Sequence, residues 1–560
     1  SLDCQLDNVP GTLGRLCAAI GEAGGNIGAL DGFDVRGPVL RRNLVVHCRN
    51  EDHQKAVVAA VQKLDGITVL DWWDRTFRMH ESGKVEVIST APVNDRDDLS
   101  MAYTPGVARV CTAIENDPLL SHKYTIRKNT VAIVSNGTAV LGLGDIGPEG
   151  AMPVMEGKAL LFKEFGGVNG FPICINARTA DEVVDFVQRI APTFGGINLE
   201  DIKAPECFEI EERLRASLDI PVFHDDQHGT AVVTLAALWN SLKITGKKME
   251  DLTVVIAGVG AAGVAIGKIL LNAGIGDVIG CDRVGAIYTG RGEMNSAKEW
   301  FAANTNSSRK MGTISDVMKG ADVFVGVSGP DLITAADVRS MAKNPIVFAM
   351  ANPNPEIDYN LALETRKDVI MATGRSDFPN QVNNVLGFPY IFRGALDVRA
   401  TKINEEMKMA AVKALAILAK EPVPEQVNVA YGATKLGFGQ EYIIPKPFDP
   451  RLITVVAPAV AKAAMESGVA KNPITDWAAY EDVLRERMGN DNKMVRLITN
   501  RAKLNPKKIV FAEADQLNVL KAAQIVYEDG IGFPILLGNR EIILELKAEL
   551  GFDAELEIID

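Results

Sequence analysis

The sequence predicts a multidomain α/β protein. Its 560 residues exceed the roughly 100 to 200 residues of a typical domain, so three or more domains are expected. From Leu252 onward, apolar runs of strand length alternate with helical patterns, which is typical of a parallel sheet flanked by helices. A content of 47% hydrophobic and 23% charged residues is ordinary for a globular chain.

Charge and cysteine usage narrow the class of ligand. The formal net charge of −13 argues against a nucleic-acid or anionic-membrane partner, because both repel an acidic surface. The seven cysteines include no C-x-x-C pair, which favours reduced thiols. No apolar run reaches transmembrane length, and Asp3, Gln5 and Asp7 interrupt the place where a signal peptide would be apolar. We therefore expect a cytoplasmic protein that binds small molecules.

Residues 1–78 are predicted to form a small α+β domain with the order β-α-β-β-α-β. The segments N-V-P-G-T-L at 8–13 and G-G-N-I at 24–27 resemble ACT domains. The resemblance implies that an amino acid or another small effector binds at the turn and at a subunit interface. A packing module without a ligand is the alternative, since fold does not imply function.

Residues 79–240 contain two isolated polar side chains in suggestive places. Tyr103 lies just before a Pro-Gly break, and Lys158 lies in the apolar start of a helix. Between them we expect a strand over 130–135, then a second strand from Ala139 that runs into a glycine-rich loop over 142–147. Burial or a nearby metal lowers the pKa of a lysine towards that of a base, whereas a surface lysine lying along its helix is the commoner case.

Two acidic pairs follow apolar runs in the same region. Glu200-Asp201 comes after an apolar run, and Asp225-Asp226 follows Pro221-Val222-Phe223. Both pairs are expected at strand ends, where adjacent carboxylates repel each other unless a cation binds. A hard cation such as Mg²⁺ or Mn²⁺ suits carboxylate oxygens, and the scattered Cys and His residues do not suggest zinc. Helix caps and surface charges are the alternative interpretation.

The same motifs, taken in order, resemble malic enzymes. The matching segments are A-Y-T-P-G-V-A, L-G-L-G-D-I-G, E-G-K-A-L-L-F-K, L-E-D-I and H-D-D-Q-H-G-T-A. The resemblance implies that Tyr103 is the general acid, that Lys158 is the general base and that Asp225 assists the base. It also implies that Glu200, Asp201 and Asp226 are metal ligands. Larger malic enzymes carry a malate-binding arginine just before L-G-L-G, whereas this chain has Ala139 nearby instead.

Residues 241–400 predict a Rossmann-type dinucleotide domain. An apolar strand over 253–257 leads into G-V-G-A-A-G, in which Gly258, Gly260 and Gly263 permit a tight turn and a close approach of pyrophosphate to a helix amino terminus. The next strand ends at Asp282, where a ribose contact is expected. Ser328 follows a later strand and is expected at the cofactor.

Amide side chains supply candidate substrate contacts, because an amide donates to a carboxylate and accepts from a hydroxyl. Asn352 follows a strand, and Asn383 and Asn384 stand in an amide-rich segment for which turn chemistry is the alternative. The malic enzyme resemblance marks Asn352 and either Asn383 or Asn384 as substrate ligands.

The rest of the chain is expected to be a scaffold and a further domain. Residues 401–490 predict helices that pack on the catalytic core. Residues 491–560, with K-I-V-F-A-E and P-I-L-L-G-N, resemble the start of the phosphotransacetylase-like domain of hybrid malic enzymes. That domain is associated with a response to acetyl-CoA, so acetyl-CoA or an amino acid is the expected effector of a homo-oligomer.

The expected activity is oxidation of L-malate by a nicotinamide cofactor and decarboxylation to pyruvate, with Mg²⁺ or Mn²⁺. Asp282 favours NAD through the ribose hydroxyl, whereas the hybrid group typically uses NADP, and NADP is the expected cofactor. An amino-acid dehydrogenase is the first alternative, but it does not explain the acidic residues. A non-catalytic metabolite sensor is the second.

Overall fold

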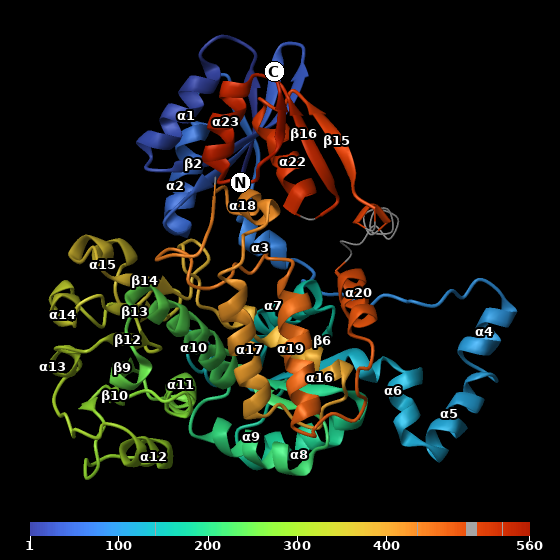
Figure 1. Cartoon of the computed structure of the whole chain (residues 1–560), viewed down its shortest axis with the longest axis vertical. Coiled ribbons are helices and arrows are strands. Elements are labelled where there is room, and N and C mark those ends of the chain that lie inside the picture. Colours follow the sequence, from blue (N-terminus) through green and yellow to red (C-terminus); the bar gives the residue numbers. More distant parts are fainter. Residues whose placement is uncertain (141, 434, 489–500, 504, 529) are drawn as a thin grey trace.

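The structure is a computed structural model that describes residues 1–560 except 141, 434, 489–500, 504 and 529; the side chains of residues 32–36 and 549 also lie outside the description. Four β-sheets organise the described residues (Figure 1). The amino-terminal and carboxy-terminal sheets lie at one end of the molecule, and the two central sheets lie at the other (Figure 1). The predicted α/β multidomain class is confirmed.

The amino-terminal unit has the predicted order of elements, β1 (Leu2–Asp7), α1 (Thr12–Glu22), β2 (Asn26–Arg36), β3 (Val39–His47), α2 (Glu51–Gln62) and β4 (Ile67–Trp72). Its strands form an antiparallel sheet in the order β2-β3-β1-β4. Leu16 and Ile20 of α1 and Val57 and Val61 of α2 are buried against this sheet. The apolar faces of the two helices therefore cover one side of the sheet.

A connector of short helices joins this unit to the first central sheet. It comprises α3 (Arg75–His80), α4 (Arg96–Ala102), α5 (Val107–Asn116), η1 (Pro118–Leu120), α6 (Ser121–Tyr124) and η2 (Ile126–Asn129). None of these helices has a buried residue. Helices α4 and α5 extend away from the rest of the chain (Figure 1). We call the segment from α4 to α5 the extended arm.

The first central sheet is parallel, in the order β6-β5-β7-β8. Its strands and helices are β5 (Thr130–Ser135), α7 (Gly147–Gly166), β6 (Asn169–Cys174), α8 (Ala180–Ile190), η3 (Ala191–Thr193), β7 (Gly196–Leu199), α9 (Glu206–Ser217), β8 (Val222–His224) and α10 (Asp225–Thr245). The strand expected from Ala139 is wrong: Gly142 and Gly144 have φ of 70° and 80°, and only an isolated Val140–Gly144 bridge forms. Left-handed glycines turn the chain into a loop instead.

The second central sheet has the order β11-β10-β9-β12-β13-β14 and is parallel except for β11. Its elements are η4 (Met249–Asp251), β9 (Thr253–Ala257), α11 (Ala261–Asn272), β10 (Asp277–Asp282), β11 (Gly285–Ala286), α12 (Ser296–Asn304), α13 (Ile314–Met318), β12 (Val323–Gly326), α14 (Ala335–Ser340), β13 (Ile346–Ala349), α15 (Tyr359–Thr365) and β14 (Ile370–Thr373). The order reverses between β9 and β12, which is the topological switch point of a Rossmann-type sheet.

Helices from the last third of the chain join the central sheets. They are η5 (Asn384–Leu386), α16 (Phe388–Asp397), α17 (Glu405–Leu418), α18 (Glu425–Ala430), α19 (Leu452–Glu466) and α20 (Trp477–Arg487). Helix α10 packs on α11 and α17, while α16 packs on α7 and α19, so one apolar core runs through both central units. Large buried side chains such as Phe162, Phe223 and Phe392 fill the centre of this core.

The carboxy-terminal unit is a small parallel sheet, β15-β16-β17, with β15 (Lys507–Ala512), α22 (Leu517–Glu528), β16 (Gly532–Leu537), α23 (Arg540–Leu550) and β17 (Glu557–Ile559). The boundary expected around Arg485 to Asn492 falls partly outside the described residues, because α20 ends at Arg487 and the description resumes at residue 501. Among the described helices, none is long and apolar enough to cross a membrane.

Candidate active site

A buried lysine is the centre of the site. Lys158 lies in α7 and is only 7% exposed. Its Nζ atom lies 2.6 Å from Asp225 Oδ2 and 2.8 Å from Glu200 Oε1, and 4.1 Å from the centre of the Phe388 ring. A buried ammonium needs such partners, because desolvation without them costs several kcal/mol. Lys158 is therefore held in place by two carboxylates from two different strand ends.

Three carboxylates surround the open side of this ion pair. Oxygen atoms of Glu200, Asp201 and Asp226 all lie within 4.8 Å of one another. Asp226 Oδ2 also accepts a hydrogen bond from the Asp201 backbone N–H at 2.8 Å, which ties the end of β7 to the start of α10. Because β7 and β8 are parallel neighbours, their carboxyl ends bring the two acidic pairs of the sequence together.

The second oxygen of Glu200 has its own partner. Asn198 is completely buried, and its Nδ2 atom donates to Glu200 Oε2 at 2.8 Å. Sequence reasoning missed Asn198 as a site residue. The available indication in the sequence was an asparagine inside an otherwise apolar strand, because an amide that becomes buried there needs a hydrogen-bond partner.

Burial sets the protonation of this cluster. Burial raises the pKa of Glu200 and of Asp225 to about 7, and that of Asp226 to about 6, although the positive charge of Lys158 opposes the shift. For Lys158, burial acts to lower the pKa, but the charges of Asp225 and Glu200 outweigh it and raise the pKa above its usual value. When ionised, the carboxylates of the cluster therefore carry more negative charge than the single ammonium group of Lys158 neutralises.

This donor set fits a divalent cation. Glu200 and Asp201 are 4% and 3% exposed, whereas the side chain of Asp226 keeps 27% of its surface exposed. Hard cations such as Mg²⁺ and Mn²⁺ bind carboxylate oxygens and retain positions for water or substrate. The three predicted metal-binding residues therefore present the expected ligand chemistry on a partly open face.

The two candidate substrate asparagines in the amide-rich segment have different surroundings. A Cβ atom at Gly229 of α10 would meet Asp225 Oδ1 at 1.8 Å and Asn384 Cβ at 3.1 Å, so Asn384 lies beside the acidic cluster. The Asn383 side chain accepts from Val385 N–H at 3.0 Å and donates to the Gly374 carbonyl at 3.1 Å. Asn383 thus caps η5, and Asn384 is the better placed of the two.

The glycine-rich loop joins the two central units at the site. The Ala139 N–H donates to the Asp201 carbonyl at 2.9 Å. A Cβ atom at Gly142 would meet the Asn352 carbonyl at 2.6 Å. The segment from Ala139 to Gly142 therefore contacts Asp201, a predicted metal-binding residue, on one side and the predicted substrate residue Asn352 on the other.

The predicted dinucleotide loop connects β9 and α11. A Cβ atom at Gly263 would meet the Gly258 carbonyl at 1.8 Å, and Gly258 has a φ of 98°. A Cβ atom at Gly260 would meet nothing within 4 Å. Gly258 and Gly263 are therefore required by the turn itself, while Gly260 leaves open space where a pyrophosphate can approach the start of α11.

Ser328 lies at the edge of the same loop. Its Cβ atom would be 3.1 Å from a Cβ added at Gly258, and its N–H donates to Glu356 Oε1 at 2.9 Å. Glu356 is completely buried and also accepts from the Ala351 N–H at 3.1 Å. It fixes the carboxyl ends of β12 and β13 to each other. Sequence reasoning missed this residue, because its partners are backbone groups.

Asp282 ends β10 as predicted, but two basic side chains already contact it. Arg291 donates to its carboxylate, and Lys298 Nζ lies 2.7 Å from Oδ2. Burial acts to raise the pKa of Asp282, but the hydrogen bonds from Arg291 and Lys298 lower it well below its usual range. The expected ribose position thus carries two positive charges as well as an acid.

Tyr103 is not part of this assembly. It caps the end of α4 in the extended arm, its side chain is 70% exposed, and the arm lies apart from the central sheets (Figure 1). Every other predicted catalytic, metal and substrate residue comes from the central units. Nothing in the motif A-Y-T-P-G-V-A predicts that Tyr103 lies apart from the other site residues.

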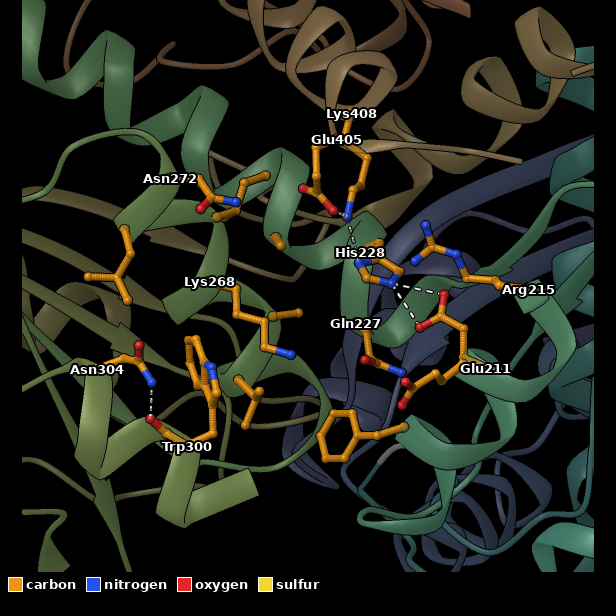
Figure 2. Close-up of a pocket in the computed structure, with 17 residues that line it drawn as sticks. Glu211, Arg215, Gln227, His228, Lys268, Asn272, Trp300, Asn304, Glu405 and Lys408 are labelled. Carbon is orange, nitrogen blue, oxygen red and sulfur yellow. Dashed lines mark hydrogen bonds and ion pairs between the residues drawn. The ribbon is translucent and has the colours of Figure 1, made fainter. Parts of the chain in front are cut away.

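A pocket of about 660 Å³ lies between α9, α10, α11, α12 and α17 (Figure 2). None of the predicted site residues lines it. His228 Nε2 lies 2.9 Å from both carboxylate oxygens of Glu211, and Lys408 Nζ lies 3.2 Å from His228 Nδ1. Burial acts to raise the pKa of Glu211, but His228 lowers it to about 2. Glu211 also accepts from the His224 N–H at 3.2 Å and so anchors the turn that carries Asp225 and Asp226.

Comparison with known families matches three parts of the chain. Residues 82–183 and 178–215 match the N-terminal domain of malic enzymes. Residues 227–432 match the NAD-binding domain of malic enzymes. Residues 493–560 match phosphate acetyl/butaryl transferases. The predicted hybrid architecture is confirmed, while the resemblance of residues 1–78 to ACT domains stays a prediction.

Individual relatives agree with these matches. An NAD-dependent malic enzyme from Geobacillus stearothermophilus is 53% identical over 81% of this chain and 92% of its own length. An NADP-dependent malic enzyme from Escherichia coli is 50% identical over 85% of this chain, which spans 63% of that protein. The crystal structure of a malic enzyme from Pyrococcus horikoshii superimposes with a TM-score of 0.68 at 42% identity, covering 76% of this chain and 98% of that structure. The chain therefore belongs to the malic enzyme family.

Proposed function

We propose that the chain oxidises L-malate at C2 with a nicotinamide cofactor and decarboxylates the product to pyruvate and CO₂. One observation carries the proposal: Lys158 is held between Asp225 and Glu200, beside the carboxylates of Asp201 and Asp226. The loop that contacts Asp201 also contacts Asn352, and the dinucleotide loop belongs to the second central unit, as Asn352 does. An amino-acid dehydrogenase does not require three carboxylates at this position.

Lys158 and Asp225 handle the first proton. Lys158 accepts the hydroxyl proton of malate, and a bound nicotinamide cofactor would take up the C2 hydride. Lys158 must be neutral to accept the proton, so its raised pKa in the metal-free cluster has to fall. Glu200, Asp201 and Asp226 would hold a divalent cation, whose positive charge would stabilise negative charge on the substrate oxygen and favour the neutral form of Lys158. Asp225 orients the lysine and stabilises the ammonium that forms.

Loss of the C4 carboxylate as CO₂ then leaves enolpyruvate, which takes up a proton at C3. Tyr103 is our candidate donor for this proton. Because Tyr103 belongs to the extended arm, we propose that the arm of a second copy inserts it into the site. Leu99, Met101 and Tyr103 are 52%, 63% and 70% exposed, and a partner surface would cover these apolar groups. A homo-oligomer follows from this arrangement.

NADP is the cofactor we propose, with NAD as the alternative. Arg291 and Lys298 place two positive charges beside Asp282, and such charges suit the 2′-phosphate of NADP. The two relatives above use NAD and NADP respectively, so the family alone leaves the preference open. Free cysteines throughout the chain agree with a cytoplasmic location, which is part of the same proposal.

The assay measures reduced cofactor, pyruvate and CO₂ from L-malate in the presence of Mn²⁺, with NADP and NAD compared at equal concentrations. We expect the three products in equal amounts and a higher kcat/KM with NADP. Release of an amino-acid product, or reduction of cofactor without CO₂, would contradict the proposed reaction.

Regulation through the appended units is the last part of the proposal. Acetyl-CoA or an amino acid is expected to shift the malate saturation curve, because a malic enzyme core requires neither terminal unit. A coupling of about 1–3 kcal/mol changes apparent affinity roughly 5- to 150-fold. Saturation curves that do not move with acetyl-CoA or a panel of amino acids would leave these units a purely structural role.

A further inference from the structure

A second polar cavity lies at the opposite end of the first central sheet from the acidic cluster. It has a volume of about 430 Å³ and lies between η1, α6, η2, α16 and the end of α20. Lys128 and Asn129 line it and immediately precede β5, whereas Glu200 follows β7, the parallel neighbour of β5. A strand of this length separates the two places by roughly 17–20 Å. The cavity is thus distinct from the proposed active site.

The cavity is strongly basic in a chain of net charge −13. Its lining contains one acidic residue, Asp397, and six basic residues: His122, Lys123, Lys128, Arg393, Arg399 and Arg487. We call it the basic pocket. Asp397 already has partners within the chain, because it forms an ion pair with Arg393 and accepts a hydrogen bond from Tyr480 Oη at 2.9 Å. Arg393 is therefore neutralised, and His122 is uncharged at neutral pH because its pKa is about 4, which leaves Lys123, Lys128, Arg399 and Arg487 as the cations of the pocket.

Three of the remaining cations have no carboxylate partner among the described residues. Lys123, Lys128 and Arg399 form no ion pair there, although Lys123 lies 5.1 Å from the centre of the Tyr124 ring. Arg487 is weakly held: its Nη1 atom lies 3.4 Å from Asn129 Oδ1, its Nη2 atom lies 3.9 Å from Asp397 Oδ1, and its buried Nε has no hydrogen-bond partner in the described structure.

Titration behaviour agrees with a concentration of positive charge. Burial, then the charges of Arg127 and Arg399, lower the pKa of His122 to about 4, although Asp219 opposes the shift. Burial and the charge of Arg393 also lower the pKa of Arg487. Neighbouring cations that destabilise each other in this way are relieved when an anion binds between them.

We propose that the basic pocket binds a compact, multiply charged oxyanion of the phosphate class. Guanidinium and ammonium groups from α6, η2, α16 and α20 line it, and Arg guanidinium suits phosphate oxygens through paired hydrogen bonds. A dicarboxylate of similar size carries fewer charges than pyrophosphate does. Arg487 ends the last described helix before the carboxy-terminal unit, so an anion there would fix α20 against the catalytic sheet.

Binding is measured by calorimetry on the full chain with EDTA present, using pyrophosphate, inorganic phosphate, glycerol phosphate and succinate as probes. The double variant Lys128→Gln/Arg399→Gln removes two cations that hold no internal ion pair, and Lys343→Gln is the matched surface control. We expect pyrophosphate to bind the wild type and the control equally. Each lost cation is expected to weaken binding by about tenfold.

The probes also distinguish the sources of phosphate. Glycerol phosphate binding more tightly than inorganic phosphate would indicate a phosphorylated metabolite, and the reverse order would indicate a free phosphate. Two results would overturn the proposal. One is pyrophosphate affinity that is unchanged in the double variant, which would place binding at the dinucleotide loop or elsewhere. The other is the absence of pyrophosphate binding to the wild type; a smaller oligomer in the double variant would then make the pocket a contact between copies.

Discussion

At the scale of single residues, the site depends on how four buried charges and one partly exposed carboxylate, Asp226, share one small volume. Lys158, Glu200 and Asp225 form an ion-pair cluster, and the carboxylates of Asp201 and Asp226 lie beside it. The adjacent acids in the sequence predicted this grouping because both pairs end parallel strands. The partners of Asp282 and the different surroundings of Asn383 and Asn384 could not be predicted, because they depend on side chains that only tertiary folding brings near.

Lys158 and Tyr103 are predicted to serve different proton transfers. Lys158→Ala should abolish malate oxidation, since it removes the base and leaves buried carboxylates without their cation. Tyr103→Phe should instead impair the protonation of enolpyruvate, because it deletes only the hydroxyl donor. Single-turnover measurements of cofactor reduction and of pyruvate formation separate the two steps. If both variants oxidise malate at the wild-type rate, the assignment of roles is wrong.

The raised carboxylate pKa values predict pH-dependent metal binding. Burial raises the pKa of Glu200 to about 7 and that of Asp226 to about 6, so protons occupy these two proposed ligands below those values. Metal binding displaces these protons, and Mg²⁺ affinity should therefore rise from about pH 6 to about pH 8 and then level off. Calorimetric titration at several pH values measures this. Affinity that is constant over the range would show that these carboxylates do not bind the ion.

The same shifts have a defined sign for stability. A carboxylate whose pKa is higher in the folded state binds more protons when folded, so the metal-free protein loses this contribution as pH rises from the unfolded pKa to about pH 7. Mg²⁺ should consequently raise Tm more at pH 8 than at pH 6. Comparing Tm with and without Mg²⁺ at each pH isolates the contribution of the cluster, because the other titrating groups contribute equally with and without the ion.

At the scale of elements, glycines decide where strands stop. Gly142 and Gly144 turn the chain after Ala139 because their backbones are in the left-handed region. The apolar residues around these glycines had predicted a strand. Other elements were predictable from local patterns. For example, G-V-G-A-A-G between an apolar strand and a helix predicts the tight turn that joins β9 to α11. The extended arm is the exception: the sequence predicted a polar connector and a Pro-Gly break there, whereas the structure forms helices α4 and α5.

Two glycine substitutions separate folding from nucleotide binding. Gly263→Ala would place a methyl group 1.8 Å from the Gly258 carbonyl, so it should lower stability by about 1–3 kcal/mol through overpacking. Gly260→Ala meets nothing within 4 Å, so it should leave Tm unchanged and weaken cofactor binding. Thermal unfolding and cofactor titration measure the two effects. A Gly260→Ala variant with wild-type cofactor affinity would show that the pyrophosphate does not approach there.

At the scale of the whole molecule, the chain is an active-site core with a regulatory unit expected at each end and an arm extended beyond it. The matched families support the core and the carboxy-terminal unit. The sequence contained the motif of Tyr103 but no information on which copy of the chain it serves. The exposure of the arm is the observation from which we propose that a partner completes the site.

Mixed oligomers test this arrangement. Lys158→Ala and Tyr103→Phe subunits are each expected to be impaired alone. When the two are mixed, unfolded and refolded together, a site with Lys158 from one subunit and Tyr103 from the other should recover wild-type turnover. Activity no higher than the average of the two parents would show that Tyr103 serves its own chain.

Metal dependence is the most direct test of the proposed active site. Malate-dependent cofactor reduction is measured in the chelated protein and after Mn²⁺ is restored, with wild type and Asp226→Asn compared. The account predicts no turnover after chelation, full recovery with Mn²⁺ in the wild type, and weaker metal affinity with a lower rate in Asp226→Asn, because the variant loses a charged oxygen ligand. Full turnover after exhaustive chelation would contradict it.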